Sequence, residues 1–138
     1  MRDQCVLKPQ DIMVLLKILV LEGRPYRLVD LGMELGLSQS EISMGLERAK
    51  KAGLIDSTKR IPLKSPLEEF LIHGLKYVFP AEPGSIDRGI PTAHSAPPLA
   101  QRIVSENHDQ LVWAFPEGQV RGQTVPPLYT SAPRAALK

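Results

Sequence analysis

The side chains best suited to molecular recognition lie between residues 39 and 51. On a helical wheel one face of this segment carries amide, hydroxyl, thioether, carboxylate and basic groups. In a DNA major groove, glutamine pairs with adenine, arginine with guanine and serine with either base, while methionine can contact a thymine methyl. The pattern therefore predicts hydrogen bonding and apolar contact with base edges. The residues of this face are Gln39, Ser40, Ser43, Met44, Glu47, Arg48 and Lys51.

This polar face has other interpretations. It could be an ordinary solvated helix surface. Glu47 in particular could accept a hydrogen bond from cytosine, or it could pair with Lys51 four residues further along the helix. The structural pair is the preferred interpretation for Glu47.

Basic residues are concentrated directly after this face. The whole chain has a formal net charge of only +2, so it is not a general polycation. Between Arg48 and Lys64, however, six basic residues accompany one acid, Asp56. Such clustering is typical of phosphate contacts, although a solvated basic surface is the alternative. The residues expected to bind phosphates are Lys51, Lys59, Arg60 and Lys64.

Two predicted helices position these residues. Apolar spacing indicates a helix from Leu28 to Leu35, and Gly36 ends it where a left-handed backbone is least costly. Ser38 and Glu41 form a capping-box pattern for a second helix, which should stop at Gly53. Its core stripe is Ile42, Leu46 and Ala49. Two small residues, Gly32 and Gly45, should allow close packing between the helices.

This helix pair resembles the helix-turn-helix of bacterial winged-helix transcriptional regulators, of the MarR type and its relatives. Gly36, Ser38, Ile42 and Leu46 stand where that motif has its glycine, its cap and two core residues. The resemblance covers roughly residues 8–79. It implies that helix 39–52 enters the major groove of double-stranded DNA. It also implies a homodimer that binds two half-sites about one helical turn apart.

The rest of the resembling region is expected to support the helix pair. Residues 9–22 form a helix that is apolar nearly all round, and Tyr26 follows it as a cover on the core. Residues 54–63 are either the hairpin wing of a winged helix or a simple basic loop. A further helix is expected to open with Ser65 as its cap and Pro66 in its first turn.

Residues 80–138 differ in character because they hold most of the thirteen prolines. The pattern predicts a short helix over 98–104, a strand over 111–115, a turn and a returning strand over 120–125. This proline-rich segment is expected to be an arm that packs on its own domain or on a partner subunit. Residues 80–129 could also bind another protein.

The predicted fold class is therefore mainly α, with a winged-helix-like domain over 1–79 and a proline-rich, partly β arm over 80–138. No catalytic motif, cofactor site or metal site is recognised, and the single Cys5 excludes an internal disulfide. His108–Asp109 is merely adjacent in sequence and does not make a catalytic dyad. The apolar run from 12 to 21 is too short for a bilayer, and no signal peptide is recognised. A cytoplasmic, non-membrane protein is expected.

Three functions follow from these patterns. The first is a sequence-specific DNA-binding transcriptional regulator, expected to be a repressor. The second is a protein-interaction module or antitoxin-like partner that uses the C-terminal arm, with DNA binding secondary. The third is a repressor gated by a small effector held between arm and core.

Overall fold

The computed structural model describes residues 6–103 and 110–137. The chain divides after Pro80 into two compact units, residues up to Pro80 and Ala81–Leu137, which we call unit 1 and unit 2. Cys5 and the His108–Asp109 pair considered above lie outside the described residues.

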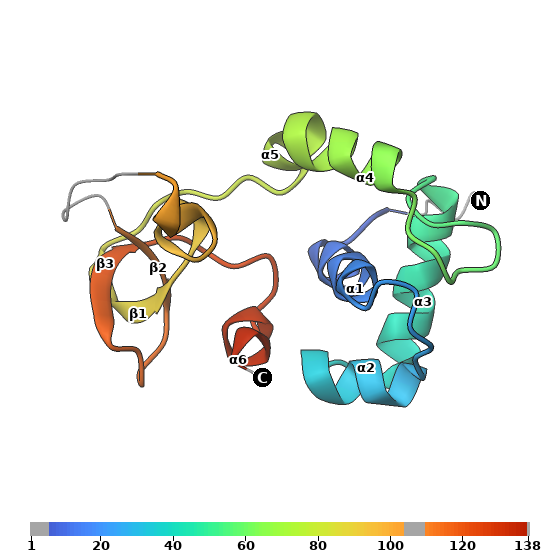
Figure 1. Cartoon of the computed structure of the whole chain (residues 1–138), viewed down its shortest axis with the longest axis horizontal. Helices are drawn as coiled ribbons and strands as arrows, with labels where there is room; N and C mark the ends of the chain where they lie inside the picture. Colours follow the sequence, from blue (N-terminus) through green and yellow to red (C-terminus); the bar gives the residue numbers. More distant parts are fainter. Residues whose placement is uncertain (1–5, 104–109, 138) are drawn as a thin grey trace. The chain divides into compact units, whose positions relative to one another are not determined.

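Unit 1 is helical. Its first three helices surround a common core, and in Figure 1 α2 runs across the lower end of α3 while α1 lies beside α3. A π-helical turn at Phe70–Gly74 joins the last two helices into one continuous rod. The helices are α1 Pro9–Val20, α2 Leu28–Leu35, α3 Gln39–Lys51, α4 Lys64–Glu69 and α5 Leu75–Val78.

The turn between α2 and α3 has the predicted geometry. Gly36 adopts φ 71°, in the left-handed region where a Cβ is unfavourable. The N–H of Leu37 then donates to the Gly32 carbonyl at 3.0 Å. A Cβ on Gly32 would overlap the Leu37 carbonyl, so only glycine fits this close crossing. The two predicted helices and the glycine turn between them are therefore present.

The start of α3 is fixed by the predicted capping box. Ser38 Oγ accepts a hydrogen bond from the Glu41 N–H at 3.0 Å, and Glu41 Oε1 accepts one from the Ser38 N–H at 3.3 Å. Both bonds satisfy N–H groups that a helix leaves without an internal partner. The first turn of α3, which carries the candidate base-contacting residues, is therefore held in place.

The core of unit 1 is formed by the apolar stripes of these elements. Ile42, Leu46 and Ala49 of α3 are each no more than 4% exposed, as their spacing predicts. They pack in a set of buried side chains that is completed by Ile12, Val14, Leu15, Ile18, Leu31, Leu35, Leu37, Leu54, Ile55 and Leu67.

Two predicted helix boundaries are wrong. Helix α1 ends at Val20 rather than residue 22, because Glu22 and Gly23 both turn to positive φ, at 52° and 82°. Helix α4 begins at Lys64 with Leu63 as its N-cap, so Ser65 does not cap it. The Leu67 N–H already donates to the Leu63 carbonyl, which places Ser65 inside the first turn.

The segment between α3 and α4 is a short hairpin. Ile55 and Pro62 form one antiparallel bridge, and the Asp56 N–H donates to the Ile61 carbonyl at 3.0 Å. Outside this bridge, the Leu63 N–H donates to the Leu54 carbonyl at 2.9 Å. We call residues 54–63 the hairpin loop. It is more ordered than a simple loop and much shorter than a full β wing.

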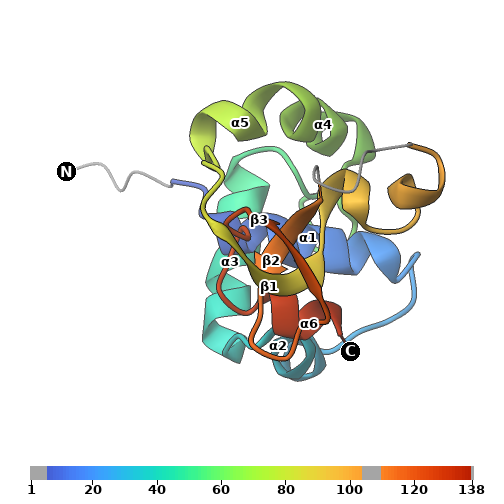
Figure 2. The ribbon, with the colours of Figure 1, turned by 90° about the vertical axis from the view of Figure 1, so that its left-hand side faces the viewer.

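Unit 2 contains a small sheet, so the chain as a whole is mixed α/β and "mainly α" fits unit 1 alone. Each strand pairs with both of the others, and the three close on one another (Figure 2). Single 3₁₀ turns and one short helix complete the unit. The elements are β1 Ile86–Pro91, η2 Ala93–Ser95, η3 Leu99–Gln101, β2 Leu111–Ala114, β3 Val120–Thr124 and α6 Ala132–Ala136.

The returning strand does not form the hairpin that the sequence suggests. Strands β2 and β3 both run antiparallel to β1 and are therefore parallel to each other, with Leu111 opposite Gln123. Glycines permit this tight closure, since a Cβ on Gly89 would overlap the Trp113 carbonyl and one on Gly118 would overlap Gly89. Val112 is completely buried at the centre. Residues 81–137 are thus a compact unit with its own sheet, whereas the sequence suggested an arm.

No helix in the described residues, 6–103 and 110–137, is long and apolar enough to cross a membrane.

Candidate nucleic-acid interface

The N-terminal half of α3 presents its predicted polar residues to solvent. Gln39, Ser40, Ser43 and Met44 are all exposed, and Met44 is 53% exposed despite its apolar side chain. Together with Leu28 of α2 they line a shallow hollow of about 500 Å³. The structure therefore brings these four predicted residues together on one accessible face.

A second hollow continues this face toward the hairpin loop. Ser43 lines both hollows, and the second, of about 310 Å³, also includes Arg27, Thr58, Lys59 and Arg60. Residues from the start of α2, the middle of α3 and the tip of the hairpin loop therefore form one continuous surface. We call it the α3 face. Arg27 was not anticipated from the sequence, because its proximity to α3 depends on how α2 packs.

Asp56 fixes the shape of the hairpin loop. Its Oδ2 accepts a hydrogen bond from the Thr58 hydroxyl at 2.7 Å, and its Oδ1 accepts from the Arg60 and Ile61 N–H groups at 2.9 and 3.1 Å. These bonds, with the Thr58 bond the largest contributor, hold the pKa of Asp56 below its ordinary value. The one acid among the predicted basic residues therefore has a structural role.

Tyr26 connects the hairpin loop to the segment before α2. Its hydroxyl donates to the Lys59 carbonyl at 3.1 Å, and the Arg60 guanidinium lies 5.6 Å from the centre of its ring. Burial raises the pKa of Tyr26, against the opposing effect of Arg60. Tyr26 was expected to cover the core, and the structure adds that it anchors the loop that carries the basic residues.

Glu47 has a different ion-pair partner from the one predicted. It pairs with Lys59 of the hairpin loop, and this hydrogen-bonded contact is the main cause of its lowered pKa. Lys51 adds only a weaker through-space effect on that pKa. The structural role favoured for Glu47 is thus observed, but the pair joins α3 to the loop, and part of the charge of Lys59 is neutralised.

Arg48 points into unit 1. Its Nε and Nη2 donate to the two carboxylate oxygens of Asp11 in α1, at 2.7 and 2.9 Å. The Asp11 side chain is fully buried and that of Arg48 is only 15% exposed. Gly45 makes room for this pair, since a Cβ there would lie 2.6 Å from Asp11 Oδ1. Arg48 is therefore engaged in the packing of α1 against α3, and Gly45 packs against α1 rather than against α2.

Asp11 is the structural residue that sequence reasoning missed. It lies in the first turn of α1, where its Oδ2 also accepts a hydrogen bond from the Lys8 N–H at 2.9 Å. An acid within a helix that is otherwise apolar nearly all round was the available signal, because such a carboxylate needs a buried partner. The sequence could not name that partner, which lies 37 residues away.

The remaining predicted phosphate contacts lie at different places. Lys51 is exposed at the C-terminal end of α3, the opposite end from Gln39. Lys64 begins α4 and lines a separate groove behind the hairpin loop. Of the basic residues proposed from the sequence, only Lys59 and Arg60 therefore line the hollows of the α3 face.

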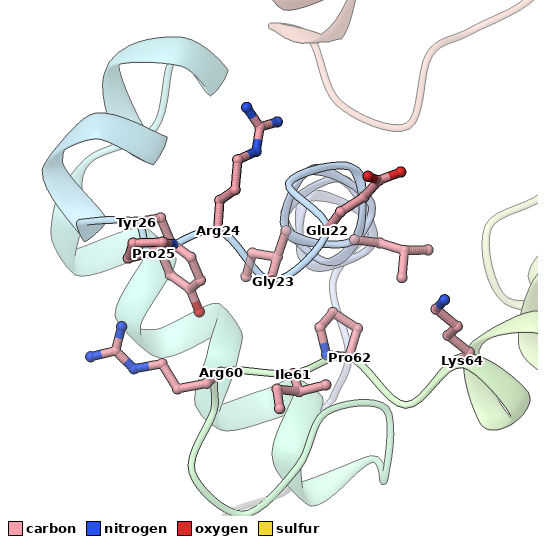
Figure 3. A pocket seen from close by; sticks show the side chains of 11 residues that line it. Glu22, Gly23, Arg24, Pro25, Tyr26, Arg60, Ile61, Pro62 and Lys64 are labelled. Carbon is pink, nitrogen blue, oxygen red and sulfur yellow. The ribbon is translucent and has the colours of Figure 1, made fainter.

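The groove behind the hairpin loop has a volume of about 600 Å³ (Figure 3). Ile18, Pro25 and Pro62 are among its apolar lining residues. Tyr26 and Arg60 stand at one end, and Glu22 and Lys64 at the other. Tyr26 and Arg60 line both this groove and the second hollow of the α3 face, so the two surfaces share two side chains.

Within the described ranges, no group of three or more histidine, cysteine, aspartate or glutamate side chains is placed to hold a metal ion. Comparisons of the chain with protein-family models, with curated proteins and with solved structures find no match.

Proposed function

We propose that the protein is a sequence-specific DNA-binding regulator that inserts α3 into the major groove. The observation that carries this proposal is the α3 face: an exposed polar half-helix, preceded by a helix-turn-helix crossing and continuous with a basic loop. In helix-turn-helix proteins the N-terminal residues of the second helix contact base edges. Gln39, Ser40, Ser43 and Met44 occupy that position here.

The basic residues beside this half-helix have the chemistry for phosphate contacts. Arg27 and Arg60 are exposed at the edge of the α3 face. A helix in the major groove is flanked by both sugar–phosphate backbones, so cations beside the helix meet phosphates. Arg27 shares its charge with Asp30, to which it donates at 2.9 Å. Arg60 carries no such acid partner among the ion pairs of the described residues, so it is the principal phosphate contact in this proposal.

The structure changes the roles of three residues in this proposal. Arg48 is removed from the base-contacting set because its guanidinium is used by Asp11. Glu47 and Lys59 stabilise the position of the hairpin loop against α3. Specificity in this proposal then depends on uncharged side chains, and affinity depends on the arginines beside them.

The wider resemblance to MarR-type winged-helix regulators extends the proposal. The hairpin loop takes the place of a short wing, and two copies of the chain bind half-sites of a roughly palindromic operator. Exposed apolar residues on the rod formed by α4 and α5, namely Ile72, Tyr77 and Val78, offer a surface for that pairing.

The test is a selection of binding sequences from a random duplex pool, followed by fluorescence anisotropy on the selected duplex and on an unrelated one. Gln39→Ala/Ser43→Ala should lower the ratio of the two affinities, because a mismatch in base contacts typically costs about 1–3 kcal/mol. Arg60→Gln should weaken both affinities equally. Lys8→Gln, just before α1, makes the same charge change away from the α3 face and should alter neither.

Two outcomes would count against the proposal. One is equal affinity for every duplex, which would mean that no bases are read. The other is affinity that does not fall with salt concentration, since phosphate contacts release counterions on binding.

The second candidate function is a protein-interaction module of the antitoxin-like kind. Unit 2 favours it, because this compact unit exposes the large apolar side chains of Ile86, Leu99 and Ile103. Light scattering of the purified chain, alone and with the product of a neighbouring gene, would test it. A stable complex that leaves the sequence preference of duplex binding unchanged would place the partner on unit 2.

A further inference from the structure

Two arginines face each other across the sheet of unit 2. In the antiparallel pairing of β1 with β3, Arg88 stands directly opposite Arg121. Side chains of directly opposed residues project from the same face, with Cβ atoms about 4.5–5.5 Å apart. Both side chains are exposed. Like charges in this arrangement destabilise a sheet unless an opposite charge lies between them.

The described residues supply little of that opposite charge. The ion pairs found within 6–103 and 110–137 involve other side chains. Asp87 borders the same hollow, and its Oδ1 accepts a hydrogen bond from the Arg88 backbone N–H at 2.7 Å. One carboxylate beside two guanidinium groups leaves the hollow with an excess positive charge.

Both arginines border an aromatic side chain that is nearly buried. They line a hollow of about 490 Å³ with Phe115, whose side chain is 9% exposed and whose N–H donates to the Arg88 carbonyl at 3.1 Å. A third arginine, Arg134 of α6, lies 5.6 Å from the centre of the Phe115 ring. Three cationic side chains of unit 2 thus gather around one anchored aromatic residue.

We infer that Arg88 and Arg121 form a second phosphate-binding site, and that its occupant is the backbone of duplex DNA. A guanidinium is a planar fork that matches two phosphate oxygens, and a phosphate between two such forks removes their mutual repulsion. The choice of DNA rests on the function proposed for unit 1. Arg88 and Arg121 supply affinity without base contacts, whereas the α3 face supplies the sequence preference.

The experiment measures the salt dependence of duplex binding by the full chain. Arg88→Gln/Arg121→Gln is compared with Lys8→Gln/Arg102→Gln, which removes the same charge from two other exposed positions. Each lost phosphate contact lowers the slope of log affinity against log salt by about 0.9, so the first variant should lose between one and two units. The control variant should keep the wild-type slope. The ratio of affinities for selected and unrelated duplexes should be the same in both.

Stability provides an independent readout. Because the two arginines repel each other in the free protein, Arg88→Gln/Arg121→Gln should unfold at the same or a higher urea concentration at low salt. A fall in affinity that came from damage to the sheet would be accompanied by the opposite shift, which would overturn the inference.

The remaining outcomes separate this site from the function of unit 1. A wild-type slope in the Arg88/Arg121 variant, with sequence preference still dependent on Gln39 and Ser43, overturns the second site alone. A reduced slope without any sequence preference in the wild type overturns the proposed function alone. Binding of polyglutamate without binding of any duplex overturns both, and indicates an acidic protein partner.

Discussion

At the scale of single residues, the contact between Asp11 and Arg48 joins α3 to α1. A fully buried carboxylate and a nearly buried guanidinium are joined by two hydrogen bonds. The desolvation cost of two such charges can exceed their attraction, so the pair is weak evidence for net stability. The fold nevertheless requires both side chains together, because removal of either one would leave the other as a buried charge without a partner.

We expect Arg48→Met to lower the free energy of unfolding by about 3–5 kcal/mol, because Asp11 would stay buried without its partner. Asp11→Leu/Arg48→Met should cost much less than the sum of the single changes, because both charges are then removed. Urea unfolding of Asp11→Leu, of Arg48→Met and of the double variant gives the coupling energy between the two side chains. Additive losses would show that the two groups do not interact.

Asp56 gives a pH-dependent prediction for the hairpin loop. Its folded-state pKa is below the ordinary value of 3.8 because Thr58 and two backbone N–H groups bind the charged form. Its contribution to stability is therefore present above pH 3.8 and is lost as the pH falls through the lower, folded-state pKa. The amide resonances of Arg60 and Ile61 should titrate with a midpoint below 3.8.

The matched control is Asp56→Asn, which retains an acceptor oxygen but no titrating group. Its Arg60 and Ile61 resonances should not change over the same pH range. A midpoint at or above 3.8 in the wild type would contradict the hydrogen-bonding role given to the Asp56 carboxylate.

At the scale of elements, α3 combines a locally specified start with a packing-dependent middle. Its capping box involves residues three positions apart. Ser38→Ala should lower the free energy of unfolding by about 0.5–2 kcal/mol. Ser40→Ala, two residues later, removes an exposed hydroxyl that makes no cap and should leave stability almost unchanged. An equal decrease in the free energy of unfolding of both variants would show that the Ser38 cap does not stabilise α3.

Gly45 tests the contact between α1 and α3. Alanine is normally favoured over glycine in a helix by about 1 kcal/mol, but a Cβ at Gly45 would lie 2.6 Å from Asp11 Oδ1. We therefore expect Gly45→Ala to destabilise the wild type. In an Asp11→Ala background the same change should stabilise the chain, because the overlapping oxygen is gone. Thermal unfolding of the wild type, Gly45→Ala, Asp11→Ala and the double variant would show whether the effect of the added methyl group changes sign.

At the scale of the whole molecule, two units are joined by a segment that belongs to neither a helix nor a strand. Residues 81–83 are exposed, and the first hydrogen bond to the sheet is made by the Gly84 N–H, to the Thr124 carbonyl at 2.7 Å. Exposed connections of this kind are the preferred sites of limited proteolysis.

We expect elastase, which cuts after small side chains, to cut first after Ala81, and we expect the fragment that contains unit 1 to unfold cooperatively. Mass spectrometry of the early digest identifies the cut, and circular dichroism of the purified fragment follows its unfolding. Faster cleavage after the buried Ala49 would show that α3 opens before the connection is cut, and this would contradict the division into two compact units.

The sequence by itself determined the elements whose signals are local. Gly36, the Ser38–Glu41 capping box and the stripe of Ile42, Leu46 and Ala49 each act over a few residues, and the structure has all of them. The exposure of Gln39, Ser40, Ser43 and Met44 follows from that stripe, because a helix that buries one face exposes the other. The function suggested by these residues is still a proposal.

Tertiary structure alone decided which residues from distant segments meet. Arg48 has the residue type of a guanine contact, and only the packing of α1 beside α3 turns it toward Asp11. Lys59 reaches Glu47 because the hairpin loop folds back on α3. The pairing of Arg88 with Arg121 depends on the register of β1 against β3, which side-chain patterns in two short strands do not fix. Contacts of this kind depend on how whole elements pack, and a local sequence pattern carries no information about that packing.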